Sequence, residues 1–143
     1  MADDIPVWTL DTSVFIAAFR PAESRHDAAV ALLDRVIRGE RRAEMPATVL
    51  TELACAVARR TDDEAAAIDV LEFLRGHAGF SFVPVTPDRA VAAARLGARL
   101  RLRGMDALVV EVAVQARATL VTLDDEMRAR SAAEVRACAP EAA

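Results

Sequence analysis

Short apolar segments alternate with longer helical segments along the chain, and this order constrains the fold more than any other feature. Strand-like apolar or alternating patterns occur at residues 7–10, 43–46, 80–85, 119–123 and 135–139. Helical patterns occur at 14–19, 23–39, 48–60, 64–76, 87–104 and 106–116, and a short helix is expected after residue 125. Strands that alternate with helices in this way predict a three-layer α/β fold with a mainly parallel sheet. With no linker or repeat, residues 1–143 are expected to form a single domain.

The charge balance argues against a protein that coats nucleic acid with a basic surface. The 18 basic residues are all Arg, the acidic residues number 22, and the formal net charge is −4. A nucleic-acid coat needs the opposite sign, although a catalytic site that approaches nucleic acid through metal ions is compatible with this balance. Because 54% of the residues are hydrophobic, a disordered chain is also not expected.

The lack of a signal-peptide or membrane-span pattern and the use of cysteine predict a cytoplasmic protein. The first six residues lack a basic segment followed by an apolar run, and no apolar stretch reaches the roughly 18 residues of a membrane span. Cys55 and Cys138 have no metal-binding spacing and are expected to be buried, reduced thiols.

Two aspartates follow directly after strong strand candidates. Asp11 ends the 7–10 segment and Asp124 ends the 119–123 segment, whereas Asp125 is expected to face solvent as a helix cap. In an open parallel sheet, functional side chains gather beyond the carboxyl ends of neighbouring strands, where the strand order reverses. Each aspartate taken alone is also explained as a helix N-cap, which is the commoner role.

Asp106 lies at the start of an almost wholly apolar helix. At 100° per residue it falls within the apolar arc of 106–116, opposite a narrow polar strip formed by Glu111 and Gln115. A carboxylate on a buried face must be paired, hydrogen-bonded or bound to a metal. The alternative is that Asp106 only caps the first turn of its helix.

Glu52 lies at the edge of the apolar face of the 48–60 helix. There it can lean into a cleft at the end of the sheet. It can equally be solvated or paired with Arg59 or Arg60.

These four acids together suggest a chemistry that none of them suggests alone. If Asp11, Glu52, Asp106 and Asp124 converge, the hydroxyls of Thr12, Ser13 and Thr122 lie beside them. Oxygen donors of this kind suit Mg²⁺ or Mn²⁺. Converging carboxylates raise one another's pKa values unless a cation is bound. With divalent ions, such a site can polarise a phosphate and activate water, which is the chemistry of phosphodiester hydrolysis.

The sequence resembles the PIN-domain ribonucleases, in particular the small VapC-type toxins of bacterial toxin–antitoxin pairs. Four elements carry the resemblance in family order: WTLDTS at 8–13, PATVLTEL at 46–53, MDAL at 105–108 and LVTLD at 120–124. The resemblance implies metal ligation by Asp11, Asp106 and Asp124, with Glu52 on the metal or its water and Thr122 as a supporting hydroxyl. It also implies a five-stranded parallel sheet, a homodimer, an RNA substrate, and a cognate antitoxin whose tail covers the site. Glu111 departs from the pattern because it replaces a small residue often found in that helix.

Arginines suggest how an acidic protein holds RNA. Arg95, Arg99 and Arg103 recur every four residues, so they are expected to form a stripe along one helix, with Arg101 close by. Arginine binds phosphate through two N–H groups, so the stripe is expected to contact the RNA backbone. The alternative is an ordinary solvated helix face. Without the four proposed ligands, 18 acids balance the 18 arginines, so the net charge can be assigned to one site.

Two other functions remain open from the sequence. A catalytically silent module that acts through a binding partner would keep the same fold. A haloacid-dehalogenase-like phosphatase would use Asp11 as a nucleophile, but Ser13 stands where that chemistry usually has a second acid, and the chain has no Lys.

Overall fold

The five expected strands form one sheet in the computed structural model, which describes residues 5–143. The strands are β1 (Val7–Leu10), β2 (Arg42–Pro46), β3 (Phe80–Val83), β4 (Thr119–Val121) and β5 (Ala137–Cys138). Their order is β3-β2-β1-β4-β5, and every neighbouring pair is parallel. The expectation of no signal peptide concerns the first six residues, and residues 1–4 of these lie outside the described part of the chain.

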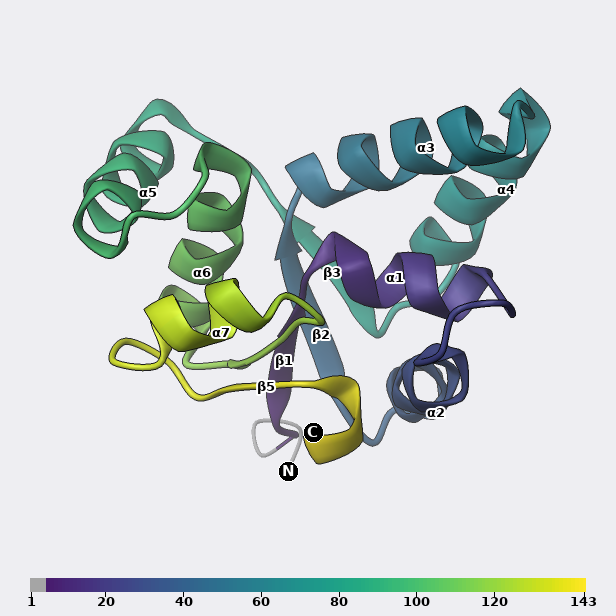
Figure 1. Cartoon of the computed structure of the whole chain (residues 1–143), viewed down its shortest axis with the longest axis horizontal. Helices are drawn as coiled ribbons and strands as arrows, with labels where there is room; N and C mark the ends of the chain where they lie inside the picture. The colour runs from purple at the N-terminus through teal and green to yellow at the C-terminus, as the bar shows by residue number, and fades with distance from the viewer. Residues whose placement is uncertain (1–4) are drawn as a thin grey trace.

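Helices cover both faces of this sheet. They are α1 (Thr12–Phe19), α2 (His26–Ile37), α3 (Thr48–Thr61), α4 (Glu64–Arg75), α5 (Pro87–Leu100), α6 (Gly104–Ala116) and α7 (Asp125–Ser131), followed by a 3₁₀ turn at Pro140–Ala142. Helices α5 and α6 lie on one side of the sheet and α1 to α4 on the other (Figure 1). This arrangement confirms the predicted three-layer α/β/α fold. No helix in the described part of the chain is long and apolar enough to cross a membrane.

The strand order reverses beside β1, and this reversal creates the site. The chain runs outward from β1 through β2 to β3, then returns through α5 and α6 to place β4 on the free side of β1. Leu10 pairs with Val121, and the backbone N–H of Asp11 donates to the Val121 carbonyl at 3.0 Å. Because β1 and β4 are parallel neighbours, the residues that follow them share one end of the sheet.

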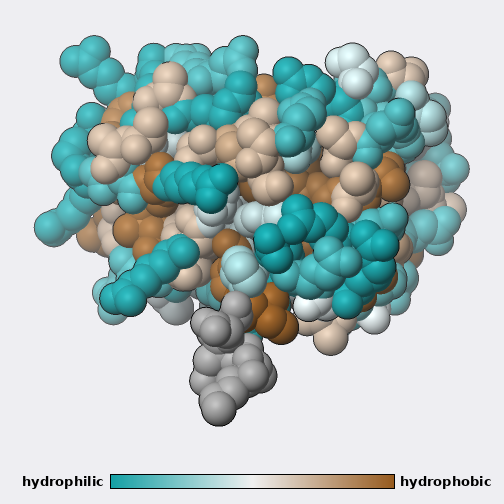
Figure 2. Space-filling view, turned by 90° about the horizontal axis from the view of Figure 1, so that it is seen from below, coloured by the Kyte–Doolittle hydropathy of each residue, from teal (hydrophilic) through white to brown (hydrophobic). Residues whose placement is uncertain are grey.

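The core is built by the strands and by the sheet-facing sides of the helices. Leu10 and Leu120 in the central strands, Phe15 in α1 and Val110 in α6 are completely buried. At the other end of the sheet, where the strands begin, hydrophilic side chains are spread between smaller hydrophobic patches (Figure 2). The central strands are therefore buried on both faces, as their near-continuous apolar sequences require.

Several boundaries differ from the predicted ones for local reasons. Strand β3 ends at Val83, because Pro84 has no N–H to extend a ladder. Helix α6 begins at Gly104, so Asp106 lies inside its first turn. Helix α4 begins at Glu64, as expected, because Asp63 caps it by accepting from the Ala66 N–H at 3.2 Å.

The cysteines also differ from expectation. Cys55 is exposed on α3 and Cys138 is partly buried, and both are free thiols. Burial raises the pKa of the Cys138 thiol, although Arg136 and Arg128 oppose the shift. The prediction of two buried thiols is therefore wrong for Cys55, which lies on the solvent side of its helix.

Candidate active site

Asp11 is held by hydroxyl groups at the junction between β1 and α1. It occupies the N-cap position of α1, but its side chain makes no capping hydrogen bond. Instead its Oδ2 accepts from Ser13 Oγ at 2.8 Å and from Thr122 Oγ1 at 2.9 Å. Asp11 therefore does not act as a simple helix cap. Its carboxylate is oriented by two hydroxyl groups, one after β1 and one after β4.

Thr122 links the two strand-end aspartates. Its side chain is completely buried, and its Oγ1 also accepts from the backbone N–H of Asp124 at 3.1 Å. Ser13 Oγ makes a parallel link by accepting from the Leu123 N–H at 3.1 Å. These bonds cross from β1 to the end of β4 and hold Asp11 in position relative to Asp124.

Asp124 fills the helix N-cap role considered from the sequence. Its Oδ1 accepts from the Met127 N–H at 3.0 Å and so caps α7. One carboxylate oxygen is thus used for the cap. The neighbouring Asp125 faces solvent as expected, with a side chain that is 88% exposed, and it pairs with Arg128 in the next turn. The expectation that Asp125 is the cap is wrong, because the N-cap of α7 is Asp124.

Glu52 reaches the site from α3. Its Oε1 accepts from Thr12 Oγ1 at 3.4 Å. Burial raises the pKa of Glu52, and the negative charges of Asp11 and Asp106 raise it further. No ion pair joins Glu52 to Arg59 or Arg60 in the described residues. Glu52 therefore leans towards the other acids and not towards those arginines.

Asp106 completes the group from the first turn of α6. The N-cap position of that helix belongs to Arg103, so the capping alternative for Asp106 does not hold. Burial raises the pKa of Asp106, followed by the charges of Asp11 and Asp124, while nearby Arg103 lowers it. The charges of Asp11 and Asp124 thus lie close enough to Asp106 to disfavour its ionisation.

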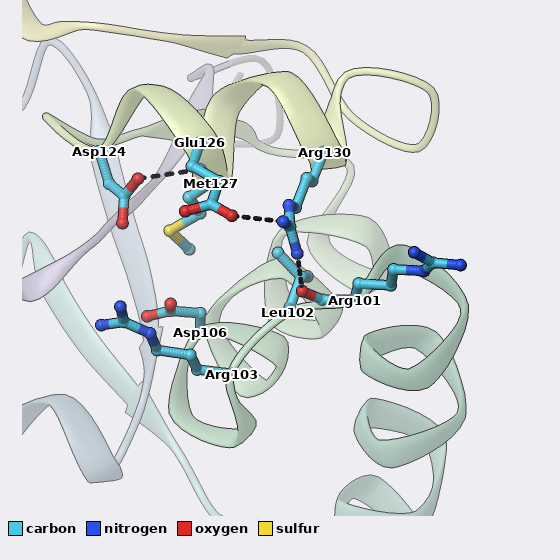
Figure 3. A pocket seen from close by; sticks show the side chains of 8 residues that line it. All are labelled: Arg101, Leu102, Arg103, Asp106, Asp124, Glu126, Met127 and Arg130. Atoms are coloured by element: carbon cyan, nitrogen blue, oxygen red, sulfur yellow. Dashed lines mark hydrogen bonds and ion pairs between the residues drawn. The ribbon is translucent and has the colours of Figure 1, made fainter.

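A cavity of about 120 Å³ opens between two of these acids. Asp106 and Asp124 face each other across it, with Arg103 beside Asp106 and Met127 behind (Figure 3). A wider groove of about 620 Å³ continues from Asp106 to Glu52 along the small residues of α5. Glu52, Asp106 and Asp124 therefore line two adjoining hollows that share Asp106, whereas Asp11 lines neither of them.

The donor chemistry of the site fits a hard divalent cation. All the converging donors are carboxylate and hydroxyl oxygens, which Mg²⁺ and Mn²⁺ prefer. Within residues 5–143, no three acidic, His or Cys side chains form a ready-made metal cage. The raised pKa values of Glu52 and Asp106 nevertheless show crowded negative charge, which a cation would relieve. Carboxylate side chains change rotamer when an ion binds, so these acids can close around a cation.

The predicted arginine stripe is divided by the backbone. Arg101 ends α5 in the left-handed conformation, at φ 57°, and this turn sends the chain away from the helix axis. Arg95 and Arg99 line a different cavity, and Arg99 pairs with Glu134 at 2.5 Å. The single stripe is therefore a wrong prediction, because a helical period does not continue through a left-handed residue.

Glu111 also differs from its predicted place in a solvent-facing strip. Its side chain is only 7% exposed and accepts from Arg89 Nη1 on α5 at 2.7 Å. Gln115, four residues further on, is exposed as expected. Helix α6 is therefore covered on this side by α5.

Sequence reasoning missed Glu126 and Arg130, which line the cavity from α7. The two residues form an ion pair at i, i+4 spacing. That spacing directly after Asp124 was the available signal, but on its own it is typical of any exposed helix.

Comparisons with solved structures identify the same fold. Similar chains include VapBC2 from Rickettsia felis bound to a promoter DNA fragment, at a TM-score of 0.70 and 15% identity over 93% of this chain and 98% of that one. VapC20 from Mycobacterium tuberculosis, a toxin that cleaves the sarcin–ricin loop, aligns with a TM-score of 0.71 and 20% identity. The alignment covers 85% of this chain and 93% of that one. FitAcB from Neisseria gonorrhoeae aligns with a TM-score of 0.68 and 22% identity, over 93% of this chain and 97% of that one.

A search of curated proteins finds no match to this sequence. The PIN domain family model, by contrast, matches residues 9–133, which include all four acids. The sequence match and the shared fold agree, and the chain belongs to the PIN domain family.

Proposed function

We propose that this protein is an Mg²⁺- or Mn²⁺-dependent endoribonuclease of the VapC type, which hydrolyses phosphodiester bonds in structured RNA. One observation carries the proposal: four carboxylates from four separate elements converge where the strand order reverses, and buried Thr122 fixes one of them. Membership of the PIN family supports the same activity.

The acids divide the work of such a reaction. Asp11, Asp106 and Asp124 would hold the metal, and Glu52 would bind it or its water. The bound ion would polarise the phosphate and supply activated water. Its raised pKa makes Glu52 a stronger proton acceptor than an ordinary carboxylate, so we propose that it takes a proton from the attacking water.

Arg103 is the predicted RNA-binding arginine that lies beside Asp106 (Figure 3). We propose that it holds a backbone phosphate next to the metal-binding acids. Arg95 and Arg99 line a separate cavity and would contact only RNA that extends beyond the acids, and Arg101 would contact RNA at the rim of the cavity.

A cognate antitoxin is the proposed protein partner. One similar solved structure, with a TM-score of 0.60 and 17% identity, is a toxin–antitoxin complex from Klebsiella pneumoniae. A mainly apolar cavity of about 250 Å³ between α1, α3 and α4 offers a place for an antitoxin segment. A homodimer and a cytoplasmic location belong to the same proposal.

Removal of divalent metal tests the activity itself. Purified protein is expected to cleave a structured RNA with Mg²⁺ or Mn²⁺ and to lose this cleavage in EDTA, because the carboxylates by themselves repel phosphate. Gel analysis of end-labelled RNA measures both states. Asp125→Asn is the matched control, since it removes an exposed charge next to Asp124 and is expected to keep full activity. Equal cleavage in EDTA and in Mn²⁺ would exclude a metal-dependent nuclease.

Thr122→Val tests the support given to Asp11. Valine keeps the shape but loses the hydroxyl that donates to Asp11 Oδ2, so cleavage and Mn²⁺ affinity are expected to fall by about 10- to 100-fold, as for other groups that orient metal ligands. Calorimetric titration and initial cleavage rates measure the two effects.

Thr9→Val is the control for that change. Thr9 is equally buried in β1, but its hydroxyl has no hydrogen-bond partner in residues 5–143. Its replacement is expected to leave both quantities unchanged and the fold as stable or more so. Equal effects of the two substitutions would show that Thr122 acts only through packing.

A further inference from the structure

The loop between α5 and α6 is very short and leads directly to Asp106. Only residues 101–103 join the two helices. Arg101 takes the left-handed conformation, and the Leu102 N–H donates to the Gly97 carbonyl at 2.9 Å, which ends α5. Because Asp106 lies in the next turn, the placement of this loop decides where the Asp106 carboxylate points.

Arg130 attaches this loop to α7. Its guanidinium donates to the backbone carbonyl of Arg101 and forms an ion pair with Glu126 on its own helix. Figure 3 shows Arg130 reaching across the cavity wall, while the Arg101 side chain extends away from Asp106. A planar guanidinium can bind two acceptors in fixed directions at once.

The same helix carries Asp124 as its N-cap. A continuous path therefore runs from Asp124 through α7 to Arg130, to the Arg101 carbonyl, and through the loop to Asp106. This path links the two acids that face each other across the cavity.

We propose that Arg130 is a positioning residue that fixes the α5–α6 loop to α7 and thereby sets the separation of Asp106 and Asp124. Glu126 orients its guanidinium for this contact. The proposal rests on the proposed function only in assuming that these two acids bind a metal ion.

A simple charge effect predicts the opposite result from positioning. A guanidinium near the acids repels a cation, so its removal would tighten Mn²⁺ binding if charge were its only contribution. If Arg130 holds the two acids at a fixed separation, its removal weakens Mn²⁺ binding instead. The sign of the change in affinity therefore separates the two roles.

Calorimetric titration of the full chain with Mn²⁺ measures this sign. Arg130→Gln is expected to weaken Mn²⁺ binding by about tenfold, the lower range for groups that orient metal ligands. Arg130→Lys keeps the charge but loses the planar guanidinium that holds two acceptors in fixed directions, so it is also expected to bind Mn²⁺ more weakly. The Arg99–Glu134 pair still joins the end of α5 to the segment after α7, so these variants are expected to fold.

Arg101→Gln is the matched control. It removes a charge from the same loop but keeps the backbone carbonyl that Arg130 contacts. Its Mn²⁺ affinity is expected to be unchanged or higher.

Hydrogen exchange in metal-free protein tests the attachment without any metal or RNA. The backbone N–H of Leu102 donates to Gly97 at the end of α5, and that of Ala107 donates to Arg103 at the start of α6. Both amides are expected to exchange faster in Arg130→Gln and at the wild-type rate in Arg101→Gln. Unchanged exchange at these amides, together with equal or tighter Mn²⁺ binding, would overturn the proposal. If the wild-type protein binds no Mn²⁺, the metal-dependent function fails, and exchange alone decides the role of Arg130.

Discussion

Asp106→Asn is expected to lower RNA cleavage by about 100- to 1,000-fold while making the metal-free protein more stable at pH 7. The loss follows because a metal ligand supports several kcal/mol of transition-state stabilisation, and about 1.4 kcal/mol corresponds to a tenfold change in rate. The gain follows because burial and the charges of Asp11 and Asp124 disfavour the ionised Asp106 carboxylate.

The pH dependence of stability has a definite sign. Because the folded-state pKa of Asp106 is raised, the native protein binds more protons than the unfolded chain between the ordinary pKa and the raised one. The free energy of unfolding contributed by this group therefore falls as pH rises through that window. Glu52 contributes in the same direction. In EDTA, the stability advantage of Asp106→Asn over the wild-type protein is expected to grow on going from acid to neutral pH.

Thermal unfolding in EDTA at several pH values measures this effect, with a shift of about 2–4 °C expected for each 1 kcal/mol in a domain of this size. Asp125→Asn is again the control, since its exposed carboxylate is expected to affect neither cleavage nor stability. An Asp106→Asn variant that is inactive and also less stable would indicate a structural role for Asp106 and would contradict this account.

Arg89→Met is expected to destabilise the fold by about 3 kcal/mol, because it leaves the buried Glu111 carboxylate without its partner. The Glu111 side chain extends from α6 towards α5 and is almost fully buried, so water cannot easily take the place of the lost guanidinium. Urea unfolding measures the change in the free energy of unfolding.

The double variant Arg89→Met with Glu111→Leu distinguishes a lost ion pair from lost packing. Without the buried charge, most of the stability is expected to return, since apolar replacements of buried pairs are often neutral or stabilising. A double variant as unstable as Arg89→Met would show that the arginine acts through its contacts with other groups.

Much of this site could be predicted from local sequence. Asp11 and Asp124 each follow a short apolar strand, and parallel strands place such residues at one end of a sheet. Asp106 stood out because a carboxylate in an apolar helix needs a partner. The structure brings these acids together with Glu52, although their metal ligation stays a prediction.

The errors share a cause, which is that periodicity describes one helix and not its neighbours. Glu111 has the sequence context of a solvent-facing residue, yet α5 covers it and supplies Arg89. The arginine stripe assumed a helix through residue 103, but the left-handed Arg101 ends α5 two residues earlier.

By itself, the sequence determined the order of strands and helices, the parallel sheet and the acids at the strand ends, because these depend on local periodicity and on the geometry of parallel strands. Only the tertiary structure decided which polar groups are paired. The contacts of Thr122 with Asp11 and of Arg130 with the Arg101 carbonyl join residues 111 and 29 positions apart. Such pairings depend on how helices pack across the sheet, and no local pattern specifies that packing.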